Sequence, residues 1–144
     1  MTQEEKDTYY LDIAKAVAIR STCLFGDVGC VIVDADDNLI STGYLAYNDD
    51  IINCRQQGYC SYAEHEKLAT VKFGVPETCD YMFPEVNAII NADRTRLKKG
   101  TMYIYAYDRI NNKPIKVQIE KTVSKIILKS GIKRIVLSKD DDEE

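Results

Sequence analysis

The sequence has no tryptophan, a single histidine and three prolines, and no cysteine follows Cys79. No apolar run approaches the roughly 20 residues that a membrane-spanning helix needs. The first residues also lack the apolar segment of a secretory signal. The net charge of −4 argues against the basic face that a nucleic-acid polymer requires. We therefore expect a cytoplasmic protein that neither crosses a membrane nor binds DNA or RNA.

What is present is typical of a soluble globular chain. Hydrophobic residues make up 45% and charged residues 29% of 144 positions, enough for one core. We expect a single domain over residues 1–138 and a disordered acidic tail over 139–144. In a cytoplasmic protein the five cysteines are predicted to be reduced thiols or metal ligands rather than disulfides.

The pattern of apolar residues and turn signals alternates between helical and extended periodicity. It predicts helices over 4–22, 63–73, 84–94 and 120–130, strands over 28–33, 39–44, 101–107 and 134–138, a loop over 48–61 and a hairpin arm over 115–119. This order predicts an α/β sandwich with a mixed sheet.

Several short segments carry a family pattern in the same order along the chain. They are 20–23 (RSTC) with 28–33 (VGCVIV), 41–44 (STGY), 85–89 (EVNAI), 100–103 (GTMY) and 130–136 (SGIKRIV). Together they resemble the dCMP deaminase branch of the cytidine deaminase superfamily. The resemblance implies an α/β/α sandwich around a mixed five-stranded sheet, with residues 109–119 as an inserted hairpin arm.

Deaminases of this superfamily hold a catalytic zinc with one histidine and two cysteines, in an H-x-E motif followed by P-C-x-x-C. In this sequence the three ligand positions fall on Phe83, Glu120 and Val123, and the glutamate of the motif is retained as Glu85. Phenylalanine and valine cannot coordinate a metal, so we expect no catalytic zinc. An alternative register, on 62–65 (YAEH), places a tyrosine at the first ligand position and lies too far from the next motif.

Many members of this branch also carry a second, structural zinc. The resemblance places its ligands on Cys23, Cys54, Cys60 and Cys79, and four thiolates complete a tetrahedral site. The single histidine, His65, could replace one of them. The alternative is that these cysteines are buried thiols, which pack as small apolar side chains. Cys30, in an apolar strand, is predicted to belong to the core.

The resemblance places a ligand site around Phe83, Glu85, Tyr44, Leu45 and Tyr47. Leu45 occupies the position of a substrate-contacting asparagine, and the tyrosines could stack on a base. The alternative is that the aromatic residues only pack the fold. Glu85 would then be a carboxylate favoured by the dipole at the start of its helix.

These features favour a non-catalytic deaminase-fold protein that binds a nucleotide or nucleotide-derived signal, and so senses or sequesters it. Two alternatives stay open. One is a structural partner subunit of an active deaminase. The other is a deaminase-type hydrolase that uses a relocated metal, with Glu85 as general base. The resemblance also implies a homo-oligomer, whose interface the inserted residues 109–119 either extend or block.

Overall fold

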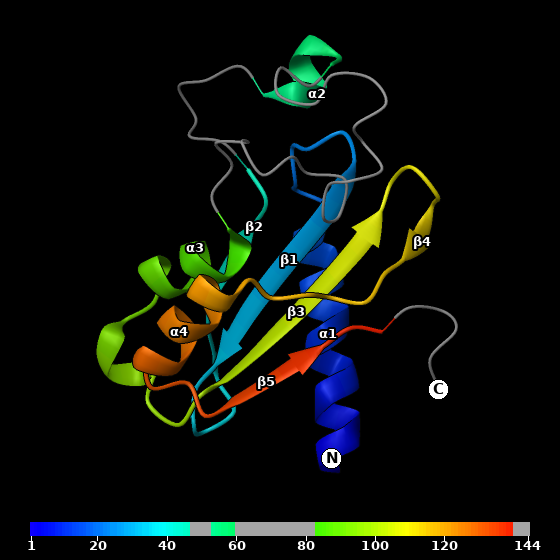
Figure 1. Ribbon diagram of the computed structural model, residues 1–144. Helices are drawn as coiled ribbons and strands as arrows, with labels where there is room; N and C mark the ends of the chain where they lie inside the picture. The colour runs from blue at the N-terminus through cyan, green and yellow to red at the C-terminus, as the bar shows by residue number, and fades with distance from the viewer. Residues whose placement is uncertain (47–52, 60–82, 140–144) are drawn as a thin grey trace.

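The computed structural model describes residues 1–46, 53–59 and 83–139. Within them, five strands form one sheet in the order β2-β1-β3-β4, and β5 also pairs with β3. The strands are β1 (Gly26–Val33), β2 (Leu39–Tyr44), β3 (Thr101–Asp108), β4 (Lys113–Pro114) and β5 (Arg134–Leu137). β1 runs antiparallel to β2 and β3, whereas β5 runs parallel to β3. The predicted mixed five-stranded sheet is confirmed (Figure 1).

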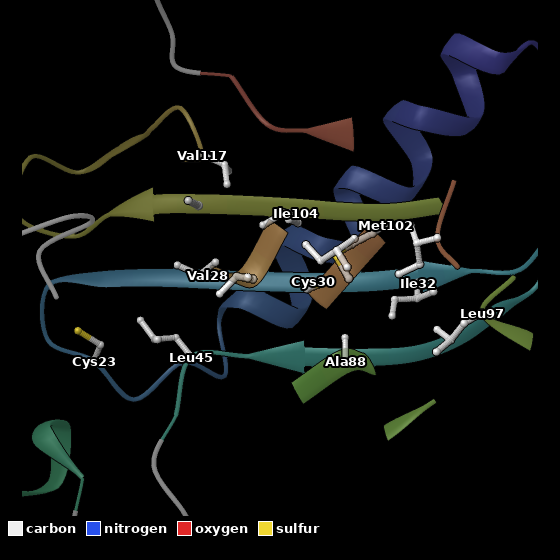
Figure 2. Packing of buried hydrophobic residues seen from close by; sticks show 14 of the residues in the cluster. Cys23, Val28, Cys30, Ile32, Leu45, Ala88, Leu97, Met102, Ile104 and Val117 are labelled. Atoms are coloured by element: carbon white, nitrogen blue, oxygen red, sulfur yellow. The ribbon is translucent and has the colours of Figure 1, made fainter. Parts of the chain in front are cut away.

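Helices cover both faces of this sheet, as predicted (Figure 1). They are α1 (Gln3–Ala18), α2 (Cys54–Gln57), α3 (Pro84–Asn91) and α4 (Lys121–Lys129), with a short 3-10 helix, η2 (Arg94–Arg96). Successive residues of β1 point to opposite faces because the side-chain period of a strand is two. Val31 and Val33 therefore pack under α1, whereas Cys30 and Ile32 pack under α3 and α4 (Figure 2).

A partly exposed ion pair between Asp7 and Arg134 holds α1 on the sheet. The Arg134 guanidinium donates two hydrogen bonds to the Asp7 carboxylate, at 2.7 and 2.5 Å. The Tyr103 hydroxyl donates a third, at 2.8 Å. The bonds from Arg134 hold the pKa of Asp7 well below its usual range. α1 is therefore fixed to β3 and β5 by polar contacts as well as by its apolar face.

The inserted segment differs from the predicted hairpin arm over 115–119. Only Lys113–Pro114 pairs with β3, and Ile115 adds one bond to the Ala106 carbonyl at 3.1 Å. Ser138, after β5, already uses that edge, since its amide bonds the Ile104 carbonyl at 2.9 Å and its hydroxyl accepts from the Ala106 amide at 3.2 Å. The inserted hairpin arm is thus present, but it is shorter than predicted and lies over Lys113–Pro114 rather than 115–119, because two segments cannot pair with the same backbone groups. The chain instead crosses the sheet toward α4 and buries Val117 (Figure 1).

Other boundaries differ at the ends of elements. The helix predicted over 4–22 ends at Ala18, and the predicted loop over 48–61 contains α2. α1 stops where Arg20 and Ser21 form turn-type bonds back to Val17 and Ala18. The predicted helix over 63–73 and most of the acidic tail, 140–144, lie outside the described residues. No helix in the described part of the chain is long and apolar enough to cross a membrane.

Candidate ligand site at the start of helices α3 and α4

Glu85 lies in the first turn of α3 and is buried, with 6% of its surface exposed. Desolvation raises the pKa of its carboxyl to about 6, and its own backbone amide is its one hydrogen-bonding partner within the described residues. Cys30 lies close by on β1, and burial followed by the charge of Glu85 raises the pKa of its thiol. Cys30 is fully buried in the core, as predicted. Among the described residues, the Glu85 carboxyl therefore lies in the core beside β1 with no side-chain partner.

The position of Glu85 depends on how α3 lies against β2. A Cβ atom at Gly43 would lie 2.2 Å from the Pro84 carbonyl oxygen, so helix and strand backbones touch at this residue. The Ser41 hydroxyl donates to the Ala88 carbonyl at 2.7 Å. Two side-chain amides of α3 donate to β2 carbonyls, Asn87 to Tyr44 at 3.4 Å and Asn91 to Thr42 at 3.3 Å. Residues of the EVNAI segment thus tie the helix to the edge strand.

The other predicted ligand residues lie around the same end of α3. Phe83 is the N-cap residue of α3, makes no side-chain capping bond and is 44% exposed. The Tyr44 ring is half-buried under the Arg20 guanidinium, 4.6 Å from the ring centroid. Leu45 is buried in the core, which leaves little of it for a ligand (Figure 2). Tyr47 lies outside the described residues.

The positions expected for a catalytic metal hold no ligand set. Val123, in the first turns of α4, is 2% exposed and packs in the same core as Ala88 and Val117. Glu120 is the exposed N-cap residue of α4 and makes no capping bond. One carboxylate, with phenylalanine and valine at the other two expected positions, does not fit a zinc ion. Within residues 1–46, 53–59 and 83–139, no three His, Cys, Asp or Glu side chains are grouped as a metal site would need.

Two of the four cysteines proposed as structural ligands are described. Cys23 follows α1 and Cys54 begins α2, and each is 2% exposed. The Phe25 amide donates to the Cys23 sulfur at 3.4 Å. The Arg55 side chain donates to the Cys23 carbonyl at 3.1 Å, so these two segments lie against each other. The remaining candidate ligands are outside the described residues, namely Cys60, His65 and Cys79.

Sequence reasoning did not single out two charged residues near these cysteines. Asp27, at the start of β1, is 8% exposed and paired with Arg55 of α2. A second guanidinium, that of Arg109, lies 3.5 Å from the same carboxylate. The only signal for them in the sequence is an arginine directly after a cysteine. No periodicity marks an ion pair between residues 28 positions apart.

Known proteins resemble this chain along most of its length. A family model described as "Cytidine and deoxycytidylate deaminase zinc-binding region" matches residues 4–139. The deoxycytidylate deaminase of Saccharomyces cerevisiae is 32% identical over 100 residues, 67% of this chain and 29% of that protein. The deoxycytidylate deaminase of Mycobacterium phage D29 is 29% identical over 97% of this chain and 99% of its own length. The chain thus spans less than a third of its yeast relative but nearly all of the phage protein.

Solved structures agree on the fold. The apo dCMP deaminase of cyanophage S-TIM5 superposes with a TM-score of 0.61 at 15% identity, over 99% of this chain and 88% of that one. Acinetobacter baumannii RibD superposes with a TM-score of 0.53 at 19% identity, over 96% of this chain and 29% of that one. At these identities the likeness speaks for the architecture alone. With the match of the family model to residues 4–139, the chain belongs to the cytidine and deoxycytidylate deaminase zinc-binding family.

Proposed function

We propose that this chain is a non-catalytic member of its family that binds, and so senses or sequesters, a nucleotide or nucleotide-derived signal. The observation that carries the proposal is Glu85, a buried carboxyl whose single partner within the described residues is its own amide. Burying such a group costs stability unless hydrogen bonds compensate it, and buried carboxyls with a perturbed pKa are concentrated at functional sites. The helix dipole stabilises a carboxylate in the first turn whether or not that carboxylate is buried, so the dipole alone does not explain why Glu85 is buried. Contact with a ligand explains the burial better.

The chemistry of Glu85 suits the edge of a nucleobase. With its pKa raised to about 6, the carboxyl changes protonation near neutral pH. It can therefore donate a hydrogen bond when protonated and accept one when ionised. Bases are read through hydrogen bonds on their Watson–Crick edge and through stacking on aromatic side chains. Phe83 offers an exposed ring two residues away. The relatives named deoxycytidylate deaminases point to a pyrimidine nucleotide as the first ligand class to test.

The absence of metal ligands at Phe83 and Val123 supports binding over hydrolysis. A zinc ion lowers the pKa of its bound water from about 15.7 to about 7, which supplies hydroxide at neutral pH. Without such a metal the carboxyl of Glu85 has no activated water to work with. The names of the relatives favour the hydrolase alternative, which requires a metal held by other residues of this chain.

A ligand screen tests the proposal. We expect dCMP, dCTP or a cyclic dinucleotide to raise the melting temperature, because a ligand that binds only the folded state stabilises it by mass action. The shift should disappear in Glu85→Ala and persist in Glu120→Ala, which removes an exposed carboxylate. No deamination product should form, with or without added zinc. Turnover above the Glu85→Ala background would support the relocated-metal hydrolase, and the absence of any shift would favour a partner subunit.

We further propose one structural zinc per chain, held by Cys23, Cys54, Cys60 and Cys79, with His65 as a possible substitute. Two observations support it. Cys23 and Cys54 are both buried, on segments that contact each other. The Phe25 amide also donates a hydrogen bond to the Cys23 sulfur, an arrangement that favours a thiolate ligand.

We also propose that the chain forms a homo-oligomer through the outer surfaces of α3 and α4. Val123 and Ile127 of α4 face the sheet, whereas Ile126 and Leu128 are 39% and 68% exposed. On α3, Ile90 is 66% exposed. Apolar residues on the side of a helix that does not face the core are typical of contacts between subunits.

Light scattering at micromolar concentration tests the oligomer. We expect a mass that is a multiple of 16.4 kDa, reduced to that of one chain by Leu128→Asp. Ile110→Asp, in the exposed part of the inserted segment, is the companion variant. A smaller mass for Ile110→Asp as well would show that the insertion extends the interface. A single 16.4-kDa species in the unmodified protein, unchanged by ligand, would exclude the oligomer.

A further inference from the structure

Arg55 makes three contacts with the stretch of chain that runs from the end of α1 to the start of β1. Its Nε donates to the Cys23 carbonyl at 3.1 Å and its Nη1 to the Ile19 carbonyl at 3.5 Å. Its Nη2 pairs with the carboxylate of Asp27. The planar guanidinium thus joins the C-cap of α1, the loop after it and the start of β1. Because Arg55 follows Cys54 directly, these contacts hold the helix that begins with Cys54 against the loop that carries Cys23.

Asp27 provides the anionic end of this arrangement. It is buried, and its carboxylate lies between the guanidinium groups of Arg55 and Arg109. The Arg109 amide also bonds the Phe25 carbonyl at 2.9 Å. A buried carboxylate is stable when cations and donors surround it, and removing one partner leaves a charge uncompensated. The Cys23 loop and the start of β1 are therefore bound by Arg55 of α2 and by Arg109, which follows β3.

The Cys23 loop and α2 are each held in shape by their own hydrogen bonds, so the contacts of Arg55 fix where one lies relative to the other. The Ser21 hydroxyl bonds both the amide and the carbonyl of Val28, at 3.1 and 3.2 Å, and closes the loop. α2 is closed by a reciprocal capping box between Asn53 and Gln56. A guanidinium that joins two such segments therefore sets the distance between them.

We propose that Arg55 and Asp27 are positioning residues that hold the Cys23 loop and the Cys54 helix at the separation a structural metal requires. The proposal rests on the structural zinc proposed above. Zinc–sulfur bonds are about 2.3 Å long in tetrahedral sites, so the ligand-bearing segments must be held closely in place. Residues behind the ligands typically change metal affinity by 10–100-fold when mutated. Arginine suits this role because lysine cannot make the three contacts at once.

Competition with a chelator tests the proposal on the full chain. We expect Arg55→Lys and Asp27→Asn each to weaken zinc binding by at least about tenfold. Arg55→Lys keeps the positive charge but removes the planar set of guanidinium donors. A loss of zinc affinity in this variant would therefore come from the lost hydrogen-bond geometry and not from the lost charge. Arg96→Lys is the matched control, because Arg96 forms a comparable ion pair with Asp34 at 2.6 Å, away from both cysteines. Unchanged affinity in Arg55→Lys and Asp27→Asn, or equal weakening in Arg96→Lys, would overturn the proposal.

Labelling of Cys54 in metal-free protein separates the positioning role from the presence of zinc. If the unmodified chain carries no zinc, the metal proposal fails, and the labelling rate alone decides the role of Arg55. We expect a thiol reagent to modify Cys54 at least about tenfold faster in Arg55→Lys than in Arg96→Lys, because α2 then opens from the loop. Equal rates in the two variants would show that Arg55 does not hold the segments together.

Discussion

Replacing Gly43 with alanine should destabilise the protein by about 3 kcal/mol, the upper range for a group inserted into a packed interior. The added Cβ would lie 2.2 Å from the Pro84 carbonyl oxygen and 2.7 Å from the Ala88 amide nitrogen. Both atoms belong to the backbone of α3, so no side-chain rotation can relieve the contact. The helix must move off β2, and Glu85 moves with it. Urea unfolding at neutral pH measures the loss.

Gly29→Ala is the matched control for this prediction. Its Cβ would lie 2.2 Å from the Ala14 carbonyl oxygen, so it displaces α1 on the opposite face of the sheet. We expect a similar loss of stability from both variants. Only Gly43→Ala should abolish a ligand-induced shift in melting temperature, since only α3 carries Glu85. An unaltered stability of Gly43→Ala would show that α3 can shift on the strand at no cost.

Glu85→Gln should stabilise the protein by about 2 kcal/mol at about pH 8, although it removes the one motif residue that is retained. Burial raises the pKa of Glu85 from 4.5 to about 6, so the folded chain binds this proton more tightly than the unfolded chain. The contribution of Glu85 to stability is therefore fully present below about pH 4.5, falls as the pH rises through about 6, and stays about 2 kcal/mol lower above that. Glutamine has no charge to desolvate and avoids that loss.

Comparison of urea midpoints at about pH 5 and about pH 8 tests the sign, since the gain from Glu85→Gln should shrink below about 1 kcal/mol at the lower pH. Glu120→Gln, at an exposed N-cap, should change stability by less than about 0.5 kcal/mol. A gain that does not depend on pH would mean that ionisation of Glu85 is not its cause. A fold more stable without its buried carboxylate is the behaviour expected when a residue serves binding rather than folding.

These two predictions concern a single contact between a helix and an edge strand. Gly43 allows the close approach, and Asn87 and Asn91 hold it by bonding carbonyls of β2. The same approach buries Glu85. The segments that carry the family resemblance, 41–44 and 85–89, are therefore the two sides of one interface. Their order in the chain therefore indicates the fold independently of the metal site.

Much of the architecture could be predicted from the sequence. The apolar run 28–33 and the alternation in 101–107 predicted two central strands, and Pro84 predicted the start of α3. Such signals are local, because side-chain periodicity and turn residues act within a few positions of the chain. The motif order added the family and the position of Glu85. The ligand, the structural zinc and the oligomer stay predictions.

The tertiary structure alone decided three features that involve distant residues. The inserted hairpin arm lies over Lys113–Pro114 and does not extend through 115–119, because Ser138 bonds the same edge of β3. Glu85 is buried because Gly43 brings α3 onto the strand, which no single segment indicates. Asp27 and Arg55 meet across 28 positions. Local patterns in the sequence are enough to predict the family and most of the strands and helices. Burial and pairing of charges depend on which segments meet, and only the folded chain decides that.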